Sequence, residues 1–167
     1  MGFVMRTCSQ FTSIKVLKIL YCSIVRSILE YCSQSIQRRF IRYLQYRCRV
    51  TDSCYEARCH RFHMLPLHKR REIADIVFLV KIAQNLIESP ELLSKINLKI
   101  PTRTVRRPVY LDTPRCATNY RRNSFIVRSA YDVNKLVTFP DLDLFNTKPL
   151  HFKNTLAKSW FEGSLTV

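Results

Sequence analysis

The densest group of residues able to do metal chemistry lies between positions 54 and 63. Cys54, Cys59, His60 and His63 place four possible zinc ligands within ten residues. A structural zinc site usually takes two well-separated ligand pairs that close a loop around the metal. This spacing is tighter, and the adjacent Cys59 and His60 cannot share one face of a helix. We therefore expect structural cysteines and histidines and no metal, with a metal-stabilised interaction module as the alternative.

Carboxylates suited to catalysis are scarce. Asp141 and Asp143 are separated by one residue and could bind a cation, but they lie between Pro140 and Pro149 with no further ligand nearby. A turn or capping role is the simpler interpretation. No set of a nucleophile, a histidine and an acidic residue elsewhere in the sequence suggests a catalytic site. We therefore expect no cofactor and no enzymatic activity from this chain.

Basic residues interleaved with aromatic residues form the most informative pattern. The chain has 28 lysines and arginines against 12 acidic residues, a net charge of +16 that a polyanionic partner would relieve. Nucleic acid is the first candidate partner and an anionic membrane surface the second; a solvated basic surface is the alternative. The clusters lie at 38–43, 69–71, 106–107 and 119–122. We expect Arg38, Arg39 and Arg42 to contact phosphates, and Phe40 and Tyr43 to be core residues.

Glycine is nearly absent, which limits both chemistry and fold. Gly2 and Gly163 are the only two, so phosphate-binding loops of the GxGxxG or GxxxxGK[ST] type are excluded. Turns must be made by proline, asparagine, aspartate and serine, which favours helices. We predict a mostly α fold, an irregular bundle of about five to seven helices with a short extended or hairpin segment near 97–118.

Helical periodicity positions the basic clusters. The first helix should begin after Thr12 or Ser13. A second stripe covers 36–44, and the two either form one long helix or turn near 32–35. Residues 48–67 show no regular pattern, and further helices are predicted at 68–87, 90–96, 124–138 and 152–161. The first stripe comprises Ile14, Leu17, Tyr21, Ile24, Ile28 and Tyr31, and the apolar face of 68–87 comprises Ile73, Ile76, Val77, Val80, Ala83, Leu86 and Ile87.

Lys69, Arg70 and Arg71 fall in the N-terminal turn of the 68–87 helix, where the helix dipole disfavours cations. That unfavourable placement suggests a partner outside the helix.

The cysteines and hydropathy indicate a compartment. Seven cysteines at irregular spacing, without a secretory segment, favour free thiols in a reducing intracellular compartment, the cytoplasm or nucleus. The longest apolar run, Ile76 to Val80, is far shorter than a membrane span, so we expect no membrane-spanning helix.

Several stretches in order resemble the region after the catalytic palm of jockey-like non-LTR retrotransposon reverse transcriptases. They cover most of residues 1–155, although the family carries a further Trp-containing stretch before Ile36 that this chain lacks. The stretches are the residues 1–6, 17–32, 36–43, 55–59, 65–72 and 89–93, followed by Pro101-Thr-Arg and Thr118-Asn-Tyr-Arg.

This resemblance implies a thumb-like helical region at 1–96 and a C-terminal extension at 97–167, packed as one unit. It implies binding to the backbone of RNA or an RNA–DNA duplex, with the absent palm domain as a further partner. The palm carries the metal-binding carboxylates, so the fragment would not polymerise by itself. A poorly folded transposon remnant is the alternative. The resemblance assigns backbone contacts to Arg38, Arg39, Arg42, Lys69, Arg70, Arg71, Tyr120 and Arg121.

Overall fold

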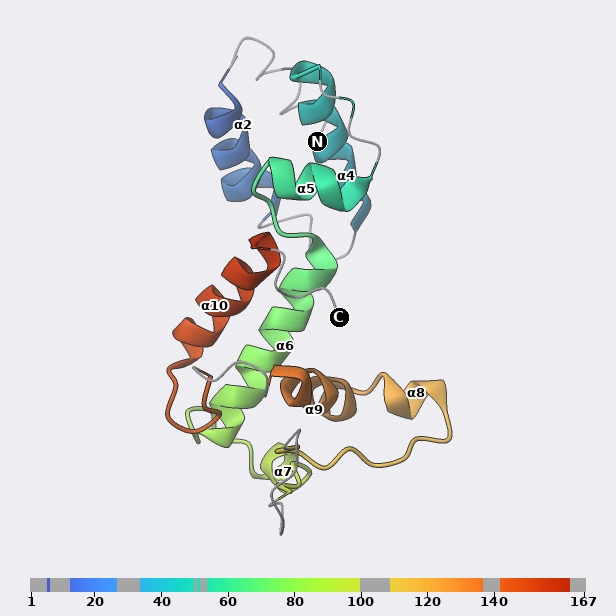
Figure 1. The fold of residues 1–167 in the computed structure, drawn as a ribbon, viewed down its shortest axis with the longest axis vertical. Helices are drawn as coiled ribbons and strands as arrows, with labels where there is room; N and C mark the ends of the chain where they lie inside the picture. Colours follow the sequence, from blue (N-terminus) through green and yellow to red (C-terminus); the bar gives the residue numbers. More distant parts are fainter. Residues whose placement is uncertain are drawn as a thin grey trace. The chain divides into compact units, whose positions relative to one another are not determined.

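The computed structural model describes residues 6, 13–26, 34–49, 51, 54–99, 109–136 and 142–162. Over these residues the fold is mostly helical, as predicted, with eight α-helices, one π-helical turn and no strand (Figure 1). By compactness the chain divides into unit 1, residues 1–69, and unit 2, residues 70–167. The boundary between 96 and 97 rests on the family resemblance and stays a prediction.

Unit 1 contains the first described helices and the beginning of α6 (Leu67–Ala83). The predicted irregular stretch at 48–67 is wrong in part, because it contains α5. That helix has seven residues and buries only Cys59, so it has no apolar stripe to reveal it. The elements are α2 (Ile14–Leu20), the π-helical turn η1 (Tyr21–Val25), α4 (Gln34–Arg47) and α5 (Tyr55–Arg61).

The apolar stripe of the first helix changes register at η1. The amide of Arg26 donates to the carbonyl of Tyr21, an i→i+5 bond that widens the turn by one residue. Tyr21 and Val25 are therefore buried, whereas Ile24 is 49 % exposed. The prediction of Ile24 as a core residue is wrong for this reason. The other predicted stripe residues after it, 28 and 31, lie outside the described residues.

The core of unit 1 forms between η1 and α4. The rings of Tyr21 and Phe40 stack with centroids 4.0 Å apart and planes 8° from parallel. Ile41 and Leu44 complete the buried side of α4, and Gln37 is buried among them. The Gln37 Nε2 donates to the carbonyl of Leu65 at 2.8 Å, which satisfies a backbone acceptor just before Pro66.

Three described helices are followed by a residue other than glycine in the left-handed conformation. Arg49, His63 and Asn85 have φ values of 49°, 47° and 56°, so each adopts the left-handed conformation that follows many helices. After α5, the amide of Met64 donates to Cys59 and that of His63 to His60, the bonding pattern of a Schellman motif. His63 therefore has a backbone role in ending this helix.

The same motif ends α6 (Leu67–Ala83) four residues before the predicted end at 87. The amide of Leu86 donates to Lys81, and that of Asn85 to Ile82. Leu86 is consequently 62 % exposed and not a core residue as predicted. The buried face of the helix includes Leu79 and Ile82, which the predicted stripe omitted.

Unit 2 completes the described helices. α7 (Pro90–Leu93) begins with Pro90 at its first position after Ser89, as predicted, although the Ser89 side chain makes no capping bond. α9 (Phe125–Leu136) falls within the predicted 124–138 helix, and α10 (Pro149–Phe161) begins earlier than predicted because Pro149 starts it. The short α8 (Asn119–Arg122) lies in a predicted basic cluster and was not expected as a helix.

In the described parts of the segment near 97–118, residues 97–99 and 109–118, Leu98 and Leu111 form an antiparallel bridge. Asn134 of α9 holds this segment, because its Oδ1 accepts from the amide of Leu111 at 3.0 Å and its Nδ2 donates to the Leu111 carbonyl at 2.8 Å. A side-chain amide thus satisfies both backbone groups of a residue that is 1 % exposed.

A compact turn precedes α10. Asp143 accepts hydrogen bonds from the amide of Phe145 and the side chain of Asn146, the turn role expected for this aspartate. Gln84, at the end of α6, donates to the carbonyls of Leu144 and Thr147 at 3.0 and 2.8 Å. The end of α6 is thereby joined to the segment that starts α10.

We expect Gln37→Leu to lower the free energy of unfolding by about 1–3 kcal/mol, because the Leu65 carbonyl would lose its buried donor. Urea unfolding followed by circular dichroism measures the change. Ala57→Leu adds the same side chain at an exposed position of α5 and should change stability by less than about 0.5 kcal/mol. Equal stability of Gln37→Leu and the wild type would contradict the assigned role.

Asn85→Ala should destabilise the protein by about 1 kcal/mol, because a Cβ is unfavourable in the left-handed conformation. Asn85→Gly should be at least as stable as the wild type. Ala74→Gly, at an exposed position inside α6, should instead cost about 1 kcal/mol. Thermal unfolding compares the stability of the three variants. Equal destabilisation by Ala74→Gly and Asn85→Gly would contradict the left-handed helix end assigned to Asn85.

Candidate nucleic-acid interface

The exposed face of α4 carries the predicted arginines. Arg39 and Arg42 are one turn apart, and Arg38 lies beside them; all three side chains are exposed. The opposite face of α4 is buried, so the helix cannot rotate these cations away without exposing its core. The structure therefore brings together three of the eight predicted contacts on one rigid helix.

Helix α5 positions one edge of this face. The Arg38 guanidinium lies 5.2 Å from the ring centroid of Tyr55, the first residue of α5, in a cation–π contact. Arg58 Nη1 donates to Gln45 Oε1 at 2.7 Å, which joins α5 to α4 a second time. Arg38 is therefore held at the edge of the face before any partner binds.

Unit 1 provides few acidic groups to neutralise the arginines. Its sequence has twelve basic and three acidic residues. Of these three acidic residues, the structure describes Glu56. Its Oε1 lies 3.9 Å from His68 Nε2. Neither Arg39 nor Arg42 forms a side-chain hydrogen bond or ion pair with any described residue. Their charges face solvent and are available to an anion.

Sequence reasoning missed Tyr46. This tyrosine is 83 % exposed, and it follows Arg42 by four residues and Arg39 by seven. Helical periodicity places all three on the same face, so the spacing could have revealed it. Of the two aromatic residues that the sequence assigned to the core, Phe40 is buried and Tyr43 is half-buried with Arg47 6.0 Å above its ring.

The cluster at the start of α6 differs from the α4 face. Lys69 and Arg70 are half-buried and Arg71 is exposed. All three already interact with other groups of the protein. These residues therefore make a weaker candidate site than Arg39 and Arg42.

Tyr120 and Arg121 lie on α8 in unit 2. Tyr120 is 91 % exposed, and Arg121 is exposed beside it. The Thr118 hydroxyl accepts from the amide of Arg121 at 3.3 Å, which caps this four-residue helix. The remaining basic cluster, at 106–107, lies outside the described residues.

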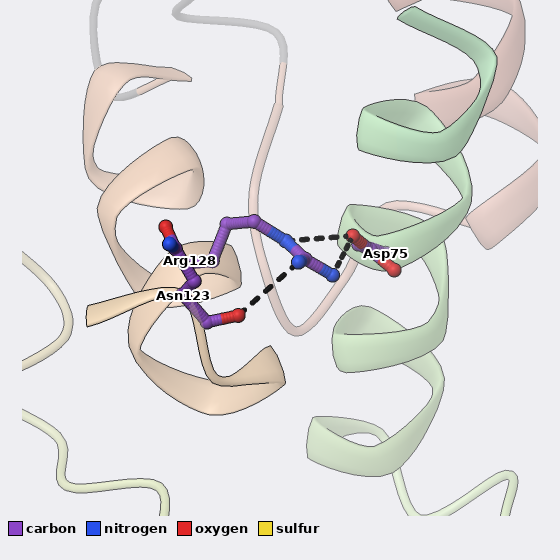
Figure 2. A network of polar contacts seen from close by, with 3 residues as sticks. All are labelled: Asp75, Asn123 and Arg128. Atoms are coloured by element: carbon purple, nitrogen blue, oxygen red, sulfur yellow. Dashed lines mark hydrogen bonds and ion pairs between the residues drawn. The ribbon is translucent and has the colours of Figure 1, made fainter. Parts of the chain in front are cut away.

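An arginine links the end of α8 to α6. Figure 2 shows Arg128 of α9 reaching Asp75, with Nε and Nη2 at 3.1 and 2.6 Å from Oδ2. Its Nη1 donates to the carbonyl of Asn123 at 3.2 Å, directly after α8. Arg128 therefore positions the segment that presents Tyr120 and Arg121.

A pocket of about 420 Å³ adjoins this segment. Arg122, Arg128 and Tyr131 are among its lining residues, and none of the lining residues is acidic. Arg128 is already paired with Asp75, so Arg122 is the cation available to a ligand there. The pocket extends the basic surface of unit 2.

The possible zinc ligands do not converge. Cys59 is buried, whereas Cys54, His60 and His63 are exposed. Across the part of the chain that the structure describes, no group of three or more His, Cys, Asp or Glu side chains is arranged to hold a metal ion. Cys54 precedes α5 and its carbonyl accepts from Arg58, while His63 ends the helix. Their positions follow from helix boundaries.

Neither a family model, nor a curated protein, nor a solved structure matches the chain. Among the described helices, none combines the length and apolar character needed to cross a membrane.

Removing the Arg128–Asp75 pair should reveal a coupling energy of at most about 1 kcal/mol, because both side chains are partly exposed to solvent. A double-mutant cycle with Asp75→Ala and Arg128→Met measures this coupling by thermal unfolding. Arg128→Met should also speed amide exchange at residues 119–123. Unchanged exchange there would contradict the positioning role of Arg128.

Proposed function

We propose that this chain binds RNA and RNA–DNA duplexes through their phosphate backbones, independently of sequence and without catalysis of its own. The observation that carries the proposal is the exposed arginine face of α4, where Arg39 and Arg42 lack partners among the described residues. Phosphate contacts of this kind set affinity and position but read no bases.

The resemblance to the thumb and C-terminal extension of jockey-like retrotransposon reverse transcriptases supports the same proposal. In such a protein these helices would hold the template–primer duplex beside a palm domain. Cys22, Cys48, Cys54, Cys59 and Cys116 form no disulfide among the described residues, which fits a proposed reducing compartment, the cytoplasm or nucleus.

Binding should weaken steeply with salt, because each phosphate contact releases condensed counterions. We expect the triple variant Arg38→Glu, Arg39→Glu, Arg42→Glu to reduce the log–log salt slope by about 2–3. Fluorescence anisotropy of a labelled RNA–DNA duplex between about 50 and 200 mM salt measures the slope.

A charge-matched control separates this face from the total charge. Lys95→Glu, Lys148→Glu and Lys153→Glu reverse three exposed lysines of unit 2 that lie outside the predicted contacts. This control should retain most of the slope. Equal losses in both triple variants would show that net charge alone drives binding, and absence of wild-type binding at about 50 mM salt would reject the proposal.

A further inference from the structure

Tyr46 is the large aromatic residue on the arginine face of α4. The residue is 83 % exposed, and its side chain makes no hydrogen bond or ring contact with another described residue. The α-helical rise places its Cα about 6 Å along the axis from that of Arg42 and about 10.5 Å from that of Arg39. An exposed ring in line with two cations that have no partner among the described residues is a different surface from a uniformly charged one.

This combination fits a strand with an accessible base. Phosphates repeat along a nucleic-acid strand, so cations and a ring spread over about 10.5 Å of helix axis can contact neighbouring phosphates and one base of the same strand. A tyrosine ring stacks on any unpaired base, whereas entry into a duplex stack requires base pairs to be unstacked at a cost of a few kcal/mol. Arginines with an aligned ring therefore favour a single-stranded segment.

A membrane surface fits the same face less well. A helix that lies in a membrane interface buries its apolar side in the lipid. The apolar side of α4 is already used inside unit 1, because Phe40, Ile41 and Leu44 are at most 2 % exposed. One tyrosine among arginines leaves too little apolar area for insertion.

We propose that Tyr46 stacks on an unpaired nucleobase while Arg39 and Arg42 bind the adjoining phosphates, so that this face prefers a single-stranded segment to a blunt duplex. This inference rests on the proposed nucleic-acid binding and specifies its substrate class.

The test compares a labelled oligouridine of about 12 nucleotides, within the usual range of single-strand site sizes, with a blunt RNA–DNA duplex of about the same length. Tyr46→Leu should weaken binding of the single strand about 5- to 100-fold and leave duplex binding within about 2-fold. Tyr46→Phe keeps the ring and should bind like the wild type. Phe145→Leu removes an aromatic ring that is 53 % exposed in unit 2 and should have no effect.

The possible outcomes distinguish base stacking by Tyr46 from the proposed binding to phosphate backbones. If Tyr46→Leu binds the single strand as the wild type does, while the arginine variant loses binding, the stacking inference fails and backbone binding stands. If the wild type binds neither probe, both fail. Tyr46-dependent binding to vesicles containing phosphatidylserine, without oligouridine binding, would assign the face to a membrane and overturn the inference.

Discussion

The carbonyl groups between residues 62 and 65 impose the constraint on which unit 1 depends. They follow the end of α5 and precede Pro66, so no helix supplies their donors. The ammonium of Lys18 on α2 binds the carbonyls of Phe62 and His63, and the amide of Gln37 on α4 binds that of Leu65. One short segment thereby joins three helices, and burial of Phe40 beside Tyr21 follows from this arrangement.

The same arrangement explains why α4 can present uncompensated charge. Its inner face is fixed by Gln37 and the stacked Phe40, and its flank is fixed by contacts with α5. Binding an anion on the outer face then requires little ordering of the backbone, which lowers the entropic cost of association. The unfavourable repulsion among the arginines is offset by the favourable packing on the buried face of the helix.

The sequence predicted the helices whose buried residues recur with the helical period. It did not predict the elements and buried residues that depend on contacts between distant parts of the chain. The stripes of α4, α6 and α9 predicted their helices, and the exposure of Arg38, Arg39 and Arg42 followed from the same period. Helix α5 depends on its Schellman end and on contacts with α4, which leave no periodic signal. Gln37 was hidden because a polar residue in a core needs a distant acceptor, and Leu65 lies 28 positions away. The internal partners of Lys69, Arg70 and Arg71 were equally invisible.

The π-helical turn η1 (Tyr21–Val25) contains one residue more than an α-helical turn that covers the same stretch of helix. Tyr21 and Val25 lie four residues apart, and both face the core across this π-helical turn. An in-frame loss of one codon between them would leave three steps, which an ordinary α-helix also places on one face. The core contacts would survive, and a surplus residue would disappear from the solvent side, where Ser23 and Ile24 are exposed. The loss of one residue here would thus return the π-helical turn to an α-helical one and keep Tyr21 and Val25 on the same face.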